Sequence, residues 1–156
     1  MDNIIKVQDI FLNYPLMCAI VAWLIAQIIK GFTGAFHDRK FNLVTFLFGC
    51  GGMPSSHSSA VMALAVSCII QYGWFSSQFA ISAVLAVIVM RDASGVRRET
   101  GEQSRVINMI LNEFIEGKSK DIDANLREIM GHTPLQVFIG ALLGIAVPFG
   151  MAAIML

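Results

Sequence analysis

Long apolar runs with almost no charge inside them most constrain how this chain can fold. Residues 14–29 contain one strongly polar side chain, Gln27, and the run from Pro134 to Leu156 contains no charged one. A helix of about 20 apolar residues crosses the roughly 30 Å of hydrocarbon in a bilayer, and it satisfies its own backbone hydrogen bonds. Both runs therefore predict membrane-spanning helices.

Three further apolar runs lie between these two. A very short turn separates Ser58–Trp74 from Phe79–Met90, which predicts a helical hairpin. Phe41–Cys50 is too short to span and ends among glycines, so it predicts a re-entrant or buried half-helix. The expected fold is a single-domain, all-α integral membrane protein with about four transmembrane helices, over about residues 14–30, 58–74, 79–95 and 134–156.

A polar stretch of about residues 91–133 separates the third and fourth predicted spans. Apolar residues recur at helical spacing over Val106–Ile115 and again over Ile122–Met130. This pattern predicts two amphipathic helices that lie on the membrane or on the helical bundle. Thr133-Pro134 then predicts the start of the last span, because an N-cap residue is followed by proline at the first helical position.

The basic residues are unevenly distributed along the chain. Three Lys or Arg residues lie between residues 30 and 40 and seven between 91 and 133, whereas the turn after Trp74 and the C-terminal run have none. Because cytoplasmic loops are enriched in Lys and Arg, we expect a cell (cytoplasmic) membrane protein whose basic loops face the cytoplasm. The 11 basic residues balance 11 acidic ones, so charge gives no indication of a nucleic-acid partner.

The sequence Gly51-Gly52-Met53-Pro54-Ser55-Ser56-His57-Ser58 leads directly into the second predicted span. The first N–H groups of a helix lack intrahelical partners and carry its positive dipole end, so a Gly- and Ser-rich entry can hold a phosphate. A purely structural interpretation is also open: the glycines permit close packing, the serines cap the helix, and His57 makes an ordinary hydrogen bond.

Ionisable residues at the ends of the four predicted spans fall at one membrane level: Lys30, His57, Asp92 and His132. Such groups usually face a bundle interior or a water-filled cleft. Two histidines beside an anion-binding loop suit phosphoryl transfer, in which one imidazole attacks phosphorus and the other protonates the leaving oxygen. A metal site made by His57, Asp92 and His132 is the alternative, although no local ligand spacing supports it.

Three motifs give the chain a resemblance to a known family. The Gly51–Ser58 segment, Asp92-Ala93-Ser94-Gly95-Val96-Arg97-Arg98 and Gly131-His132-Thr133-Pro134 resemble the divergent branch of the type 2 phosphatidic acid phosphatase superfamily. The same branch is described as acid phosphatase or vanadium-dependent haloperoxidase-related. The resemblance covers nearly the whole chain.

The resemblance implies catalytic roles for particular residues. In the wider superfamily, a P-S-G-H motif supplies the acid for the leaving group. An R-x5-H-x3-D motif supplies a phosphate-binding arginine, the nucleophilic histidine and its orienting aspartate. By resemblance His57 is the general acid, His132 the nucleophile and Arg127 a phosphate ligand. Arg127 and His132 are separated by four residues, however, and Gln136 stands where the aspartate would be, so Asp92 is the carboxylate that could supply the missing charge.

A third superfamily motif, K-x6-R-P, is not kept: Arg39 follows Lys30 at a longer interval and no proline comes after it. For Arg97 and Arg98 the structural alternative is a juxtamembrane anchor that pairs with anionic headgroups. The full set of expected phosphate ligands is Lys30, Arg39, Ser55, Ser56, Arg97, Arg98 and Arg127.

The predicted function is a membrane phosphatase that hydrolyses a lipid or isoprenoid phosphate through a phosphohistidine, with Gln136 orienting the nucleophile and with no cofactor or metal. The alternative is a non-catalytic membrane protein that binds phosphorylated lipid headgroups. Under both functions the expected partners are membrane lipids, including a phosphorylated lipid that serves as substrate or ligand. Both functions are also compatible with a homo-oligomer.

Overall fold

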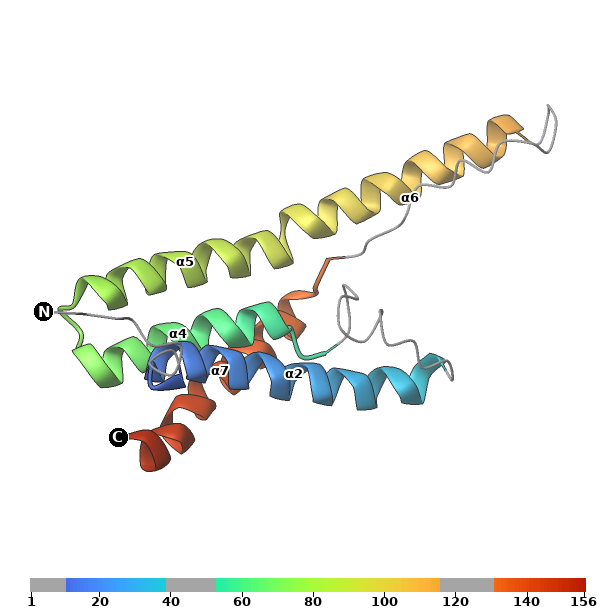
Figure 1. Ribbon diagram of the computed structural model, residues 1–156. Helices are drawn as coiled ribbons and strands as arrows, with labels where there is room; N and C mark the ends of the chain where they lie inside the picture. The colour runs from blue at the N-terminus through green and yellow to red at the C-terminus, as the bar shows by residue number, and fades with distance from the viewer. Residues whose placement is uncertain (1–10, 39–52, 116–130) are drawn as a thin grey trace, which may run out of the picture.

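The computed structural model describes residues 11–38, 53–115 and 131–156. Every regular element within these ranges is a helix: α2 (Tyr14–Asp38), α4 (Ser56–Tyr72), α5 (Ser77–Ser94), α6 (Val96–Ile115) and α7 (Pro134–Met155). Helix α4 packs against α2, α5 and α7 (Figure 1). The prediction of an all-α membrane fold is confirmed, while the expected half-helix at Phe41–Cys50 and the amphipathic helix at Ile122–Met130 lie outside the described residues.

Three stretches of the described residues are long and apolar enough to cross a membrane: Tyr14–Thr33, Ser77–Ile110 and Pro134–Met155. Helix α4 has 17 residues, or about 26 Å of helix, which is at the short end of the range for spans. It packs against both α2 and α7, which also contact each other.

Two glycines allow α7 to approach the start of α4 closely. A Cβ atom at Gly140 would collide with the Ser55 carbonyl oxygen, and one at Gly144 would collide with the Ser59 carbonyl oxygen. Small residues at such a spacing let the backbones of membrane helices pack closely where a larger side chain would hold them apart. At these two positions α7 therefore lies directly against backbone atoms of the Ser55–Ala63 stretch.

The core around α2 is built from small side chains and a few buried hydrogen bonds. Tyr14, Cys18 and Ala22 pack with residues of α4 and α7. The Tyr14 hydroxyl donates to the Pro148 carbonyl of α7 over 2.7 Å, and the Ser59 hydroxyl donates to the Ala22 carbonyl over 3.2 Å. Because buried polar groups need partners, these two bonds fix how α2 sits against α4 and α7.

Helices α5 and α6 meet at Gly95 and follow nearly the same direction (Figure 1). The Gly95 N–H donates to the Arg91 carbonyl over 2.9 Å, and a Cβ atom at Gly95 would lie 3.0 Å from that oxygen. Among the described helices α6 contacts α5 alone and extends away from the others. It therefore does not lie on the described bundle, which was one of the two placements expected from its sequence.

Candidate functional site

The start of α4 is a capped helix end with a buried serine cluster. Ser55 is the N-cap: its Oγ accepts from the Ser58 N–H over 3.4 Å and from the Ser58 hydroxyl over 2.9 Å. Ser55, Ser56, Ser58 and Ser59 are all buried. The capping expected from the serines is therefore present, and the Ser55 hydroxyl is directed into the fold.

His57 lies in the first turn of α4, and its side chain is exposed between buried serines. The loop before it contains a cis Met53–Pro54 peptide bond. The Thr33 hydroxyl of α2 is 3.1 Å from the Met53 carbonyl oxygen and 3.1 Å from that of Lys30. This contact holds the part of α2 that contains the half-buried Lys30 beside the entry to α4.

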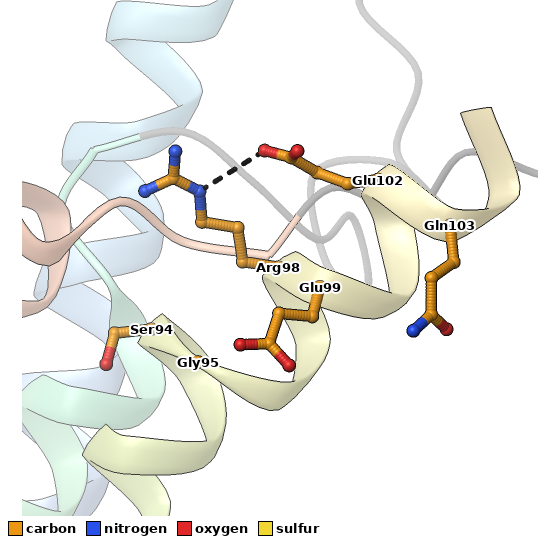
Figure 2. Close-up of a pocket in the computed structure, with 6 residues that line it drawn as sticks. All are labelled: Ser94, Gly95, Arg98, Glu99, Glu102 and Gln103. Atoms are coloured by element: carbon orange, nitrogen blue, oxygen red, sulfur yellow. Dashed lines mark ion pairs between the residues drawn. The ribbon is translucent and has the colours of Figure 1, made fainter. Parts of the chain in front are cut away.

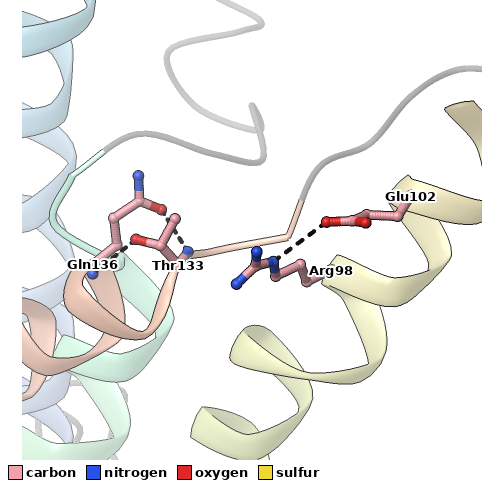
Figure 3. A network of polar contacts seen from close by, with 4 residues as sticks. All are labelled: Arg98, Glu102, Thr133 and Gln136. Atoms are coloured by element: carbon pink, nitrogen blue, oxygen red, sulfur yellow. Dashed lines mark hydrogen bonds and ion pairs between the residues drawn. The ribbon is translucent and has the colours of Figure 1, made fainter.

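The start of α7 holds the second histidine in a buried position. His132 is 8% exposed. Thr133 and Gln136 form a reciprocal capping box: the Gln136 N–H donates to Thr133 Oγ1 over 3.3 Å, and the Thr133 N–H donates to Gln136 Oε1 over 3.1 Å (Figure 3). The same Oε1 atom lies 3.1 Å from His132 Nδ1.

These contacts determine which ring nitrogen of His132 carries its proton. A backbone N–H can only donate, so the carboxamide atom of Gln136 that faces Thr133 is its oxygen. An oxygen can only accept, so the contact with His132 is a hydrogen bond from Nδ1–H. In the neutral ring, Nε2 then carries the lone pair.

Backbone hydrogen bonds join the three motifs that the sequence analysis singled out. The Ser55 N–H donates to the Gln136 carbonyl over 3.1 Å, and the His132 N–H donates to the Ala93 carbonyl over 3.0 Å. Ala93 lies in the last turn of α5, where carbonyl groups lack intrahelical partners. The half-buried Asp92 precedes it. The structure thus brings the starts of α4 and α7 and the end of α5 together.

The α5–α6 junction carries an open groove of about 520 Å³ (Figure 2). Its lining residues are Ser94, Gly95, Arg98, Glu99, Glu102 and Gln103. Arg98 Nε and Glu102 Oε1 are 3.7 Å apart, and both side chains are largely exposed, so this ion pair contributes little to stability. Figure 3 shows the Arg98 guanidinium directed toward the segment that enters α7.

Some expected site residues lie outside the part of the chain that the structure describes. These are Arg39, Arg127 and the side chain of Arg97. Within the described ranges, no three His, Cys, Asp or Glu side chains are grouped so that they could hold a metal ion.

Sequence reasoning missed several residues that hold the site together. Thr33, Ala93, Gly140 and Gly144 contribute backbone contacts or a short hydroxyl. The spacing of the two glycines, four residues apart in an apolar run, is a known signal of close helix packing. Thr33 and Ala93 carry no such signal. In the sequence, a threonine or an alanine that makes such a contact looks the same as any other threonine or alanine.

Comparison with known proteins identifies a family and a relative. The model of the Divergent PAP2 family matches residues 11–147. A protein of Bacillus subtilis (strain 168) named "Uncharacterized membrane protein YuiD" is 40% identical over an alignment that covers 93% of this chain and 98% of the relative. No solved structure shows significant similarity to the chain. With its helices long enough to span a bilayer and its three motifs at one end of them, the chain is a membrane protein that belongs to the Divergent PAP2 family.

Proposed function

We propose that this protein is a phosphatase that hydrolyses a lipid or isoprenoid phosphate at the cytoplasmic face of the membrane. The observation that carries the proposal is the arrangement at the start of α7. His132 is buried, its Nδ1 donates to Gln136, and the backbone of Gln136 binds Ser55 at the start of α4. A hydrogen bond at one ring nitrogen fixes the orientation of the imidazole, as a nucleophilic histidine requires.

In this mechanism Nε2 of His132 attacks phosphorus and the bond from phosphorus to the leaving oxygen breaks. His57, in the first turn of α4, gives its proton to that oxygen. Water then attacks the phosphohistidine with His57 as the base, inorganic phosphate leaves, and Nε2 regains its lone pair. Asp92 lies beside the Ala93 carbonyl that binds the His132 backbone, so it is the carboxylate we propose to stabilise the charged ring.

The phosphate would be held by the N-terminus of α4 and by surrounding cations. Since the Ser55 hydroxyl is used in the cap, we assign Ser55 and Ser56 a backbone role here, through the dipole end of the helix. Lys30 of α2 and Arg98 of α6 would supply positive charge, and Arg39, Arg97 and Arg127 complete the proposed set.

A binding function without catalysis is the second candidate, and one observation favours it. The residue on His132 Nδ1 is an amide, which orients the ring but cannot stabilise its cationic form by charge. A protein that only binds phosphorylated headgroups would need the same helix N-terminus and cations, and it would not need an activated imidazole.

Phosphate release from a panel of lipid phosphates tests the two candidates. Detergent-purified protein should release phosphate both with and without EDTA. His132→Ala should abolish turnover, and His57→Ala should lower it by about 10²–10⁴-fold, least for good leaving groups. His37→Ala, outside the three motifs, is the matched control and should retain activity. If the wild type releases no phosphate and His132→Ala changes only headgroup affinity, the binding function is correct.

A further inference from the structure

We infer that Gly140 is a positioning residue that sets the register between the two candidate catalytic histidines. This glycine lets the start of α4, which carries His57, hydrogen-bond to the start of α7, which follows His132. The expected effect on turnover rests on the proposed function, whereas the contact itself rests on the described backbone. The inference gives a residue without a side chain a role in the site.

Both backbone polar groups of Ser55 are engaged where the two helices meet. The Ser55 N–H donates to the Gln136 carbonyl of α7 over 3.1 Å, and the Ser55 carbonyl accepts from the Ser59 N–H over 3.1 Å. Since Ser55 is the N-cap of α4, its N–H has no partner within its own helix. Its hydrogen bond to α7 therefore fixes where α4 begins relative to α7.

Gln136 connects this bond to His132. The Gln136 backbone carbonyl accepts from Ser55, and its side-chain Oε1 accepts from His132 Nδ1 over 3.1 Å. The capping box with Thr133 holds that side chain in place. His57 follows Ser55 by two residues, in the first turn of α4. One residue of α7 thus orients one histidine and fixes the helical turn that carries the other.

Gly140 lies one turn after Gln136 in α7 and packs directly on Ser55. A Cβ atom at position 140 would lie against the carbonyl oxygen, the carbonyl carbon and the nitrogen of Ser55. That nitrogen is the donor of the bond to Gln136. Overpacking against backbone atoms forces the backbone to shift. A side chain at position 140 would therefore push the donor away from its acceptor.

Gly144 offers a matched comparison in the same helix. Its Cβ position would meet the Ser59 carbonyl oxygen, Met62 Cβ and the Ala63 nitrogen, which lie one to two turns into α4. None of those atoms takes part in the bond to Gln136. Alanine at either glycine would overpack the same pair of helices, but only the substitution at position 140 acts on the donor of that bond.

Amide hydrogen exchange of the Ser55 N–H, resolved by NMR in detergent, tests the contact without any substrate. The N–H of an N-cap exchanges rapidly unless a group outside its helix protects it. We expect slow exchange in the wild type and in Gly144→Ala, and exchange at least about tenfold faster in Gly140→Ala. Fast exchange in the wild type, or retained protection in Gly140→Ala, overturns the inference.

Steady-state kinetics on a lipid phosphate measures the effect on catalysis. A misplacement of about 1 Å can cost roughly 10²-fold in rate, so Gly140→Ala should lower kcat by about 10–100-fold. KM should change by less than about threefold, because the N-terminus of α4 that binds the phosphate moves as one unit.

Gly144→Ala should lose a similar amount of thermal stability and keep kcat within about threefold of the wild-type value. A purely structural role of Gly140 predicts a different result. In that case both variants lose activity only in proportion to the folded protein that is lost, and equal losses of kcat in the two variants overturn the inference.

The two measurements separate this inference from the proposed function. If the wild type hydrolyses no lipid phosphate, the phosphatase is refuted, and the exchange of the Ser55 N–H still decides whether Gly140 sets the register. If Gly140→Ala fails to fold, the wild-type exchange rate decides. A slowly exchanging Ser55 N–H supports the contact with α7, and a rapidly exchanging one contradicts it.

Discussion

The α4–α7 pair and the α5–α6 pair use similar lengths of helix in opposite ways. Helices α4 and α7 meet backbone to backbone at Gly140 and Gly144, and α4 buries a row of serines and alanines. Helix α5 buries few residues, among them Ser82 and Ala86, and exposes large apolar side chains such as Ile81, which is 71% exposed.

This difference shows that apolar character and close packing are separate properties in this protein. Apolar side chains on α5 match lipid and need no protein partner, whereas the tight contact between α4 and α7 depends on the absence of side chains. The candidate site stands at the end of the tight contact. The two helix pairs should therefore respond differently to the same kinds of change.

The largest expected difference concerns the two ends of the α5–α6 pair. Positions 77 and 102 are separated by about 38 Å along the helix axis, more than the thickness of the hydrocarbon. In a variant without native cysteines, Ser77→Cys and Glu102→Cys should react with a membrane-impermeant thiol reagent from opposite sides, with position 102 cytoplasmic. Labelling of both from one side would refute the predicted topology.

Added side chains at the α4–α7 contact should cause the next largest effect. Gly140→Ala and Gly144→Ala each place a methyl group against a carbonyl oxygen of α4, and overpacking of this kind costs about 1–3 kcal/mol. Gly150→Ala is the control in the same helix, since nothing lies within 4 Å of its Cβ position. Thermal unfolding in detergent gives the melting temperature of each of the three variants. Equal melting temperatures for Gly140→Ala, Gly144→Ala and Gly150→Ala would contradict the close contact between α4 and α7.

The smallest expected effect is a difference in stability between a variant without the N-cap of α4 and a variant without the N-cap of α5. Ser55 and Ser76 each accept an N–H bond from the first turn of their helix, and loss of such a cap costs about 1 kcal/mol. Ser55→Ala should cost more than Ser76→Ala, because it also deprives the buried Ser58 hydroxyl of its acceptor. Chemical unfolding measures the free energy of unfolding of both variants. A larger loss of that free energy in Ser76→Ala than in Ser55→Ala would contradict the prediction.

Much of the fold could be predicted from the sequence because hydrophobic length and local helix signals determine it. The last helix begins at Pro134 after Thr133, as predicted. Helix α2 continues through Gly31 and Gly34 to Asp38, eight residues beyond the predicted end of the first span. Two glycines cost a helix about 1 kcal/mol each, an amount that the rest of a 25-residue helix can offset.

The candidate site was predictable where its contacts are local along the chain. His132 and Gln136 are four residues apart, so a contact between their side chains could be anticipated, and the structure contains that contact. The bond from Ser55 to the Gln136 carbonyl joins helices that are far apart in sequence. No pattern in either segment indicates that bond, because any residue except proline offers the same backbone donor.

The hydrogen bond from Tyr14 to Pro148 has a consequence for biogenesis. It ties the first turn of α2 to the final third of α7, and α7 also supplies the glycines against which α4 rests. A ribosome makes α7 after the four other described helices, so α2 and α4 must wait in the membrane without a helix that contacts both of them. The bundle and its histidine pair can therefore assemble only after the last helix has been released from the translocation machinery.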